Sequence, residues 1–427
     1  MKQSKVYILD HELVSPIALG RNDIIENIKA GTDACGKIEN FDVTGLPFND
    51  GAEVRFDLKD LLKNEPNSIQ ELSKIDRKLE LLAAAFHKGA DRFSEIIELA
   101  NPARTGVYMG VGAESIPLEM FEGDVRNFLD KKLNAVIELI SKMNEGGSAI
   151  GALSNPHDLY AVYLAEKFNA KAFQNSILTA CVSSTQAIAH GYDAILNGDA
   201  DVVIAGGTDS ILNMISLISF GKLGVIPVSD GSIACLPFDI NRKGTSSGEA
   251  AGFVIMASKK FVEENNLEAL VSICGYGNTL DGYKITAPDP EGISMAKAIK
   301  DAIAEAGILA EEVDYYYAHG TGTRQNDGTE LNAMKNAFGV SAKNIPISST
   351  KDRHGHAIAA AGVQELCILI ELMQHSHIPK NLNLQTPIDE EMNLLQEDLS
   401  KPIKYAVKSN FAFGGINTVL AVKNEQL

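Results

Sequence analysis

Several features are scarce in this sequence, and each absence excludes a class of protein. The five cysteines are odd in number, widely spread and form no CxxC pair, which argues against a disulfide framework and a zinc site. The 38 Lys and Arg residues form no long basic run and are outnumbered by 56 Asp and Glu residues. The formal net charge of −18 argues against binding to nucleic acid or to an anionic membrane surface. An acidic partner would have to bind a local basic patch.

Long apolar stretches are missing as well. The first residues, MKQSKVYILD, hold one short apolar run, too short for the core of an export signal. The most apolar long segment, 357–373, contains Gln364, Glu365 and Glu371 and falls short of the roughly 20 residues that a membrane-spanning helix needs. We expect a buried helix there, no membrane association and a reduced, cytoplasmic setting.

What the chain does contain is typical of a globular protein. Its 427 residues are 45% hydrophobic and 22% charged, enough for two or three domains or for one large core built from two packed halves. Short apolar or β-branched runs alternate with helical stretches, which predicts an α/β protein with mixed or parallel sheets. The expected strands are 6–9, 105–111, 201–206, 253–257, 313–318, 345–348 and 419–422. The expected helices are 69–93, 184–196, 294–306, 330–338 and 357–375. The charged stretch 259–268 places the boundary between halves 1–265 and 266–427, although no repeat is readable.

The first chemically distinctive segment, 176–191, centres on Cys181. An apolar run ends in Thr-Ala, and small polar residues follow, as in a strand that turns sharply into a helix. At a helix N-terminus the free N–H groups and the dipole would lower the pKa of a thiol and make it a competent nucleophile. A small buried apolar role is the more common alternative for a cysteine.

The second and third segments each carry histidine after an expected strand. His319 lies where a strand runs into the Gly/Thr-rich turn GTGT, so its ring would face a cleft together with Thr321 and Thr323, unless it is only a hydrogen-bonded turn residue. In 348–362, His354 and His356 flank a glycine, so both cannot point the same way. The helix that follows is built from very small residues, which allow close approach to other backbone.

The fourth segment, 409–417, places Phe411 and Phe413 just before paired glycines. A Gly-Gly turn offers backbone N–H groups to an oxyanion, and the aromatic rings are suited to gate an apolar tunnel. An ordinary tight turn with two core phenylalanines is the alternative.

Taken together and in this order, TAC181, H319GTGT, STK351 with GH356 and AAAG, and F411AFGG resemble the elongating β-ketoacyl-[acyl carrier protein] synthases. The resemblance covers essentially the whole chain. It implies a thiolase-like fold with two pseudo-duplicated α/β halves in five α-β-α-β-α layers. It also implies a condensing enzyme with a Cys-His-His triad, which would need no cofactor beyond the phosphopantetheine of its acyl carrier protein. Thiolases use a further cysteine near the C-terminus, whereas the last cysteine here is Cys367.

The resemblance assigns a role to each motif. Cys181 would be acylated, and neutral His319 and His356 would donate hydrogen bonds to the enolate formed when a malonyl thioester loses CO₂. The backbone N–H groups of Cys181 and Phe413 would hold the oxyanion, with Phe411 and Phe413 at the gate. Which histidine nitrogen carries the proton is left open.

Further residues match supporting positions of the family. Lys351, Glu330 and Glu365 would form a buried ion-pair network that orients the histidines, or serve structure alone. Thr321 and Thr323, and less securely Thr286, would bind the phosphopantetheine arm.

Lys74, Arg77 and Lys78, at i, i+3 and i+4 of one expected helix, would dock the acidic carrier protein, with a merely solvated helix face as the alternative.

Some departures point to a specialised pathway: Ala412 replaces the middle glycine of the gate motif, and His354 stands where Thr is usual. The leading hypothesis is a homodimeric elongating synthase in fatty acid synthesis. The alternatives are an aryl polyene or polyketide ketosynthase paired with a ketosynthase-like subunit, and a non-catalytic chain-length subunit. A degradative thiolase fits less well.

Overall fold

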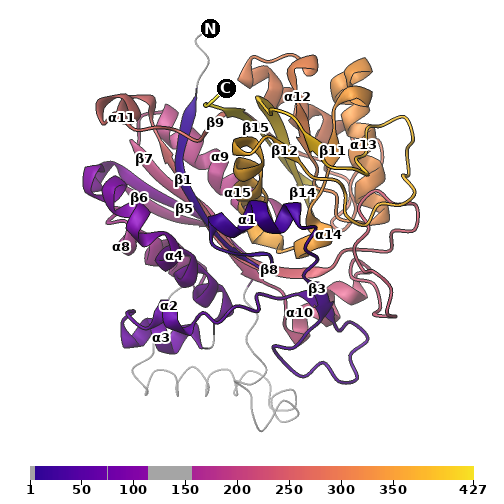
Figure 1. Ribbon diagram of the computed structural model, residues 1–427, viewed down its shortest axis with the longest axis horizontal. Helices are drawn as coiled ribbons and strands as arrows, with labels where there is room; N and C mark the ends of the chain where they lie inside the picture. Colours follow the sequence, from indigo (N-terminus) through magenta and orange to yellow (C-terminus); the bar gives the residue numbers. More distant parts are fainter. Residues whose placement is uncertain (1–4, 75, 114–155) are drawn as a thin grey trace.

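The structure is a computed structural model that describes residues 5–74, 76–113 and 156–427. One mixed sheet of 13 strands runs through the molecule, with helices on both of its faces (Figure 1). The main strands of the first half are β1 (Val6–Ser15), β5 (Thr105–Val111), β6 (Phe173–Ile177), β7 (Val202–Ser210) and β8 (Ser247–Ala257). Those of the second half are β9 (Val271–Leu280), β10 (Tyr315–Tyr317), β11 (Ile347–Ser348), β14 (Tyr405–Ala412) and β15 (Ile416–Asn424).

The two halves share one strand order. Neighbours run β6-β5-β7-β8-β1 in the first half and β11-β10-β14-β15-β9 in the second, so each half places its strands in the order third, second, fourth, fifth, first. The parallel and antiparallel pairings also match, since β5 and β10 pair in parallel on both sides while the fifth strand is antiparallel to both neighbours. The first strands, β1 and β9, join the halves through the pairing of Val6 with Ile273. The structure thus contains a duplication that the sequence did not display.

Helices complete five layers. Outer helices α4 (Arg77–Leu99) and α8 (Leu159–Lys167) cover the first half, and α12 (Ile293–Ala306) and α13 (Arg324–Phe338) cover the second. Between the halves lie α9 (Ser183–Leu196) and α15 (Ala361–Gln374). The expected thiolase-like α-β-α-β-α arrangement is therefore confirmed.

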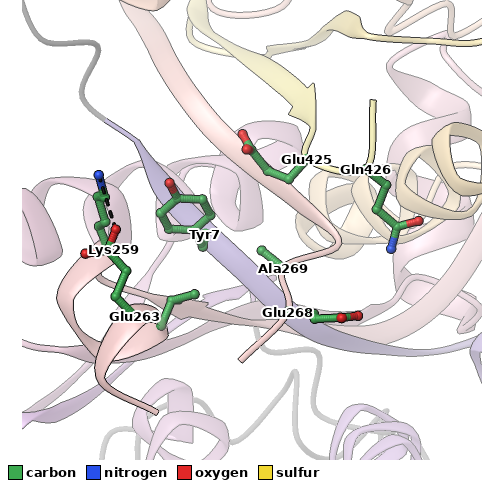
Figure 2. A pocket seen from close by; sticks show the side chains of 8 residues that line it. Tyr7, Lys259, Glu263, Glu268, Ala269, Glu425 and Gln426 are labelled. Carbon is green, nitrogen blue, oxygen red and sulfur yellow. Dashed lines mark ion pairs between the residues drawn. The ribbon is translucent and has the colours of Figure 1, made fainter. Parts of the chain in front are cut away.

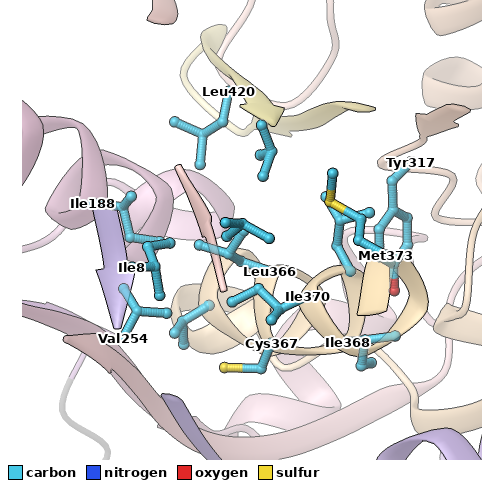
Figure 3. Packing of buried hydrophobic residues seen from close by; sticks show 14 of the residues in the cluster. Ile8, Ile188, Val254, Tyr317, Leu366, Cys367, Ile368, Ile370, Met373 and Leu420 are labelled. Carbon is cyan, nitrogen blue, oxygen red and sulfur yellow. The ribbon is translucent and has the colours of Figure 1, made fainter. Parts of the chain in front are cut away.

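The central layer has an apolar core, although the first turns of both of its helices bury polar residues, among them Thr185 and Glu365. Helix α15 is buried over nearly its whole length, and its side chains pack against residues of both halves, among them Ile8, Val254 and Leu420 (Figure 3). Burial on every side explains why this apolar segment needs no membrane. Within the described residues, no helix combines the length and apolarity needed to cross a bilayer.

The remaining helices and strands are short. The helices are α1 (Arg21–Lys29), α2 (Lys59–Leu62), α3 (Asn67–Ser73), α10 (Met214–Lys222), α11 (Lys259–Glu264) and α14 (Lys351–His354). The strands are β2 (Ala18–Leu19), β3 (Cys35–Lys37), β4 (Asp50–Ala52), β12 (His377–Ile378) and β13 (Leu399–Ser400).

The expected helix over 69–93 is wrong, because α3 ends at Ser73 and α4 starts at Arg77. Asp76 adopts an extended backbone and its side chain accepts hydrogen bonds from the N–H groups of Lys78 and Leu79. This is the geometry of a helix N-cap, which starts a new helix at this point.

Candidate active site

Cys181 lies in a 3-10 turn, Ala180–Val182, between β6 and α9. The preceding Ala180 has a φ of +50°, a left-handed conformation that turns the chain sharply from strand to helix. The expected position at a helix N-terminus is confirmed. Cys181 is 8% exposed and packs with Ile211 and Ile358, while Phe220 and Ala412 complete an apolar surround.

His356 occupies the matching place in the second half, between β11 and α15. Its Nε2 atom lies 3.1 Å from the Sγ atom of Cys181. His354, on the other side of Gly355, turns away, with Nε2 at 2.8 Å from the hydroxyl of Thr350. The two histidines therefore point to different partners, as expected.

His319 follows β10 and completes the triad. Its ring centroid lies 5.4 Å from that of His356, edge to face, and 6.0 Å from that of Phe411. The sulfur of Cys181 and one ring nitrogen each of His319 and His356 lie within 4.8 Å of one another. The structure thus brings together a sulfur and two imidazoles from both halves of the chain.

All three groups are neutral in the resting site. Burial lowers the pKa of His356 to about 3, and burial with the charge of Lys351 places the pKa of His319 well below its usual range. The expectation of a lowered thiol pKa is wrong: burial raises the pKa of Cys181 to about 12, although the charge of Lys351 opposes this. Desolvation of the thiolate outweighs the helix N-terminus at this depth.

Lys351 and Glu365 form a buried ion pair beside His319. The Lys351 ammonium also donates to the His319 carbonyl at 2.6 Å and lies 3.3 Å from its Nδ1 atom. Burial raises the pKa of Glu365, but Lys351 and Lys408 together lower it to about 2. This part of the expected ion-pair network is present.

Glu330 departs from that expectation, because no ion pair holds it in the described part of the chain. Its carboxylate accepts from the backbone N–H groups of His319 at 2.8 Å and Gly320 at 2.9 Å, and from the hydroxyl of Ser409 at 2.8 Å. Burial nevertheless raises its pKa. Glu330 therefore fixes the backbone that carries His319.

The gate segment forms the turn between β14 and β15. Phe411 is buried against His319, whereas Phe413 is half-buried. Among the described residues, no hydrogen bond joins the backbone amide of Phe413 to Cys181. The N–H of Gly414 donates to the carbonyl of Ile285 at 2.7 Å, which ties the turn to the loop that carries Thr286.

Of the three threonines, Thr321 and Thr323 lie side by side. The hydroxyls of Thr321 and Thr323 are 2.9 Å apart, and Thr323 caps α13. Thr286 is exposed. Lys284 and Ala287, which flank Thr286, line the same surface hollow of about 600 Å³ as Arg324, which follows Thr323.

A second hollow, of about 440 Å³, lies at the junction of the two halves (Figure 2). Tyr7 of β1, Lys259 and Glu263 of α11, and Glu425 line it. None of the triad residues contributes to either hollow.

The expected basic docking face is wrong in its geometry. Lys74 lies beyond the end of α3, while Arg77 and Lys78 begin α4, so the three do not share one helical face. Lys78 is buried with its ammonium 5.2 Å from the ring centre of Tyr160. Arg77 donates to the buried carboxylate of Glu249 at 2.7 Å.

Sequence reasoning missed three residues that border the triad: Thr185, Lys408 and Asn410. The Asn410 amide lies 3.2 Å from Nδ1 of His319, and Lys408 lies 3.0 Å from Glu365. Polar residues just before an aromatic gate were a signal available in the sequence.

Comparisons with known proteins agree with this geometry. Residues 3–261 match the family model described as the β-ketoacyl synthase N-terminal domain, and residues 270–385 match the C-terminal domain. A curated 3-oxoacyl-[acyl-carrier-protein] synthase 2 from Staphylococcus aureus is 29% identical over 99% of both chains.

Two solved structures superpose over nearly the whole chain. A β-ketoacyl synthase from Burkholderia phymatum gives a TM-score of 0.80 at 25% identity, over 99% of both chains. A type II PKS ketosynthase, in complex with its acyl-carrier protein and bound to a hexaketide, gives 0.79 at 26% identity over 99% of this chain and 100% of that one. With two family models matching most of its length and a Cys-His-His cluster at the junction of its halves, this chain belongs to the β-ketoacyl synthase family.

Proposed function

We propose that this protein catalyses the decarboxylative Claisen condensation of an acyl thioester with malonyl-[acyl carrier protein], as in fatty acid synthesis. The observation that carries the proposal is the approach of the Cys181 sulfur and the two imidazoles to within 4.8 Å of one another. A nucleophile beside two hydrogen-bond donors is what acylation followed by enolate formation requires.

In the first half-reaction, the sulfur of Cys181 attacks the acyl thioester. A new carbon–sulfur bond forms, the bond to the pantetheine sulfur breaks, and the thiol proton passes to the departing thiolate. His356, with Nε2 at 3.1 Å from the sulfur, lies where it can relay that proton. The result is an acyl-cysteine and a free pantetheine thiol.

In the second half-reaction, malonyl thioester loses CO₂ and leaves an enolate. Neutral imidazoles suit this step, because each can donate one N–H to the enolate oxygen in a site that excludes water. The enolate carbon then attacks the acyl-cysteine, the carbon–sulfur bond to Cys181 breaks, and the cysteine thiolate takes up a proton from solvent. We keep the N–H groups of Cys181 and Phe413 as the proposed oxyanion site.

The acyl carrier protein is the proposed partner, and its phosphopantetheine is part of the substrate. The protein needs no cofactor of its own. Our proposed contacts for the arm remain Thr321, Thr323 and Thr286. The hollow between the loop 283–290 and α13 supports this proposal. Of the three basic residues proposed for docking, we retain Lys74, which is exposed.

Three further assignments complete the proposal. We place the boundary between the halves near residue 265, in the link between α11 and β9, and propose a dimer of two such chains. Cytoplasmic location is supported by the five cysteines, all of which are unpaired.

A polyketide or aryl polyene ketosynthase that acts with a chain-length partner is the second candidate. The similarity to a type II PKS ketosynthase at 26% identity favours it. A non-catalytic chain-length subunit is disfavoured, because Cys181 and both histidines are in place.

Intact-mass analysis after incubation with acyl-loaded carrier protein tests the proposal. We expect one acyl adduct that is absent in Cys181→Ala, and elongation that depends on a malonyl rather than an acetyl donor. Absence of any adduct across donors would favour the scaffold subunit, and elongation with acetyl donors would favour a thiolase. Products longer than one extension, made only with a second subunit, would select the polyketide reading.

A further inference from the structure

A second buried lysine lies beside the triad and has no part in the reaction as described so far. Lys408, on β14, is fully buried, with its ammonium 3.0 Å from one carboxylate oxygen of Glu365. The other oxygen of that carboxylate pairs with Lys351. One buried carboxylate therefore holds two buried ammonium groups. The desolvation of three charges costs free energy, so we expect the second lysine to have a function.

The ammonium of Lys408 also donates to the side-chain oxygen of Asn410. An ammonium has three donors and no acceptor, so the Asn410 atom that faces it must be the oxygen, Oδ1. The hydroxyl of Thr185, on α9, donates to the same oxygen at 2.5 Å. The Asn410 amide is thereby held in one of its two orientations.

That orientation directs the nitrogen of the amide, Nδ2, to the other side. Nδ2 donates to Glu365 at 2.8 Å, and a carboxylate can only accept. Nδ2 also lies 3.2 Å from Nδ1 of His319. The contact of Lys408 with Oδ1 and the contact of Glu365 with Nδ2 require the same orientation of the Asn410 amide. In that orientation Nδ2 faces the histidine.

The consequence concerns the tautomer of His319. Its Nδ1 atom faces two groups that can only donate, the amide of Asn410 and the ammonium of Lys351 at 3.3 Å. In a neutral imidazole only one nitrogen carries hydrogen, and a nitrogen between two donors must be the acceptor. The proton is therefore on Nε2.

We propose that Lys408 is a positioning residue: by fixing the amide of Asn410, it holds His319 in the tautomer that carries its proton on Nε2. The use of that N–H toward an enolate rests on the function proposed above, whereas the tautomer itself does not. The charge of Lys408 has a second effect, since it adds to that of Lys351 in keeping Glu365 ionised and so an acceptor.

The hydrogen bond of Thr185 extends the same chain of contacts toward the nucleophile, because Thr185 lies in the first turn of α9, directly after the 3-10 turn that holds Cys181. Asn410 thus joins the helix that follows Cys181 to the loop that carries His319.

The test is the tautomer state of His319 in the full-length protein labelled with ¹⁵N-histidine, with its signal assigned by loss in His319→Asn. In the wild type we expect Nδ1 to show the shift of an unprotonated nitrogen and Nε2 that of a protonated one. In Lys408→Met, which keeps the volume, we expect the two shifts to move toward a mixture of tautomers. Lys423→Met, a lysine of the adjacent strand β15 that pairs with Glu425, is the matched control and should leave them unchanged.

Kinetics give the second readout. In Lys408→Met we expect kcat for condensation to fall by about 10-fold or more, since one aimed donor is worth about 10²–10³ in kcat, while acylation of Cys181 stays near the wild-type rate. A structural role alone would slow both steps together and lower Tm. Asn410→Asp, which replaces the amide donor, should shift the tautomer in the same direction and carries the test if Lys408→Met does not fold.

Unchanged ¹⁵N shifts in both folded variants would overturn the inference. Moved shifts in a protein that forms no acyl adduct would uphold the inference and reject the proposed function, so the two failures are distinguishable.

Discussion

The Nε2 atom of His356 lies 3.1 Å from the sulfur of Cys181, although 175 positions separate the two residues in the sequence. The contact exists because each residue ends the same connection in its own half, between the third strand and the helix of the central layer. The folding of both halves is therefore a condition for any reaction at this site.

Removal of His356 should separate the two half-reactions. In His356→Ala we expect acyl-cysteine still to form, because burial and not this imidazole sets the pKa of Cys181, but more slowly, because the proton relay beside the sulfur is lost. Decarboxylation and condensation should fall by about 10²–10³, the usual cost of one lost donor to a developing oxyanion. Adduct formation by intact mass and release of CO₂ from malonyl thioester measure the two steps. Loss of the adduct in this variant would contradict the division of roles.

The buried histidines should make stability depend on pH. Burial lowers the pKa of His354 to about 4 and of His356 to about 3, whereas an unfolded histidine titrates near 6.5. As pH falls from about 6.5 to about 4, these histidines bind protons in the unfolded chain but stay neutral in the folded chain. The free energy of unfolding should therefore decrease as the pH is lowered through this window.

Urea unfolding at several pH values measures this slope. His356→Gln removes one titrating group, so its slope in the window should be shallower by about 1.4 kcal/mol per pH unit. An unchanged slope would show that His356 is accessible to protons in the folded state.

Close approach of the central helices should make Gly362 intolerant of a side chain. A Cβ atom there would lie 2.1 Å from the hydroxyl oxygen and 2.7 Å from the backbone nitrogen of Thr185. We expect Gly362→Ala to lower the free energy of unfolding by about 1–3 kcal/mol, because packed helices cannot shift freely.

Gly328→Ala in α13 is the matched control for that change. The nearest atom to its added Cβ would be 4.0 Å away, in Arg242. This variant should gain about 0.5–1 kcal/mol from helix propensity. Equal effects of the two substitutions in thermal or urea unfolding would contradict the packing argument.

Arg77 should matter for folding more than for the carrier protein. Its guanidinium lies 2.7 Å from the fully buried carboxylate of Glu249, so Arg77→Ala leaves that charge with weaker compensation. We expect a loss of about 3 kcal/mol in the free energy of unfolding. Lys74→Ala should raise the apparent KM for carrier-bound substrate but not for small thioesters. The reverse pattern would restore Arg77 as a docking residue.

The sequence was a sound guide where one element carries its own signal. The strands around 6–9, 105–111 and 253–257 and the helices near 184–196 and 294–306 are present, because apolar periodicity is local. The break at Asp76 was missed, because the apolar periodicity continues across it. The Asp76 side chain caps α4 and accepts a hydrogen bond from the hydroxyl of Tyr160, a residue distant in the sequence. The edge strand β6, FQNSI, lacks an alternating pattern, and the sequence indicated only its end, where the apolar run before Cys181 turns into a helix.

The same limit applied to the site. Cys181, His319 and His356 stand in motifs whose spacing could be read, and the structure brings them together. The pKa of the thiol could not be read, because burial is a property of the whole fold. Lys408 and Asn410 stand just before the gate motif in the sequence, but their role depends on which atoms face them across the sheet, and the sequence does not show that.

The repeated strand order has one more consequence. Two identical halves would offer the same side chain twice at the point where they meet, so a homodimer of half-length chains would hold two sulfurs or two imidazoles there. Because both copies are encoded in one polypeptide, the equivalent positions differ, and a nearly symmetric scaffold presents a reaction centre with a distinct nucleophile and donor.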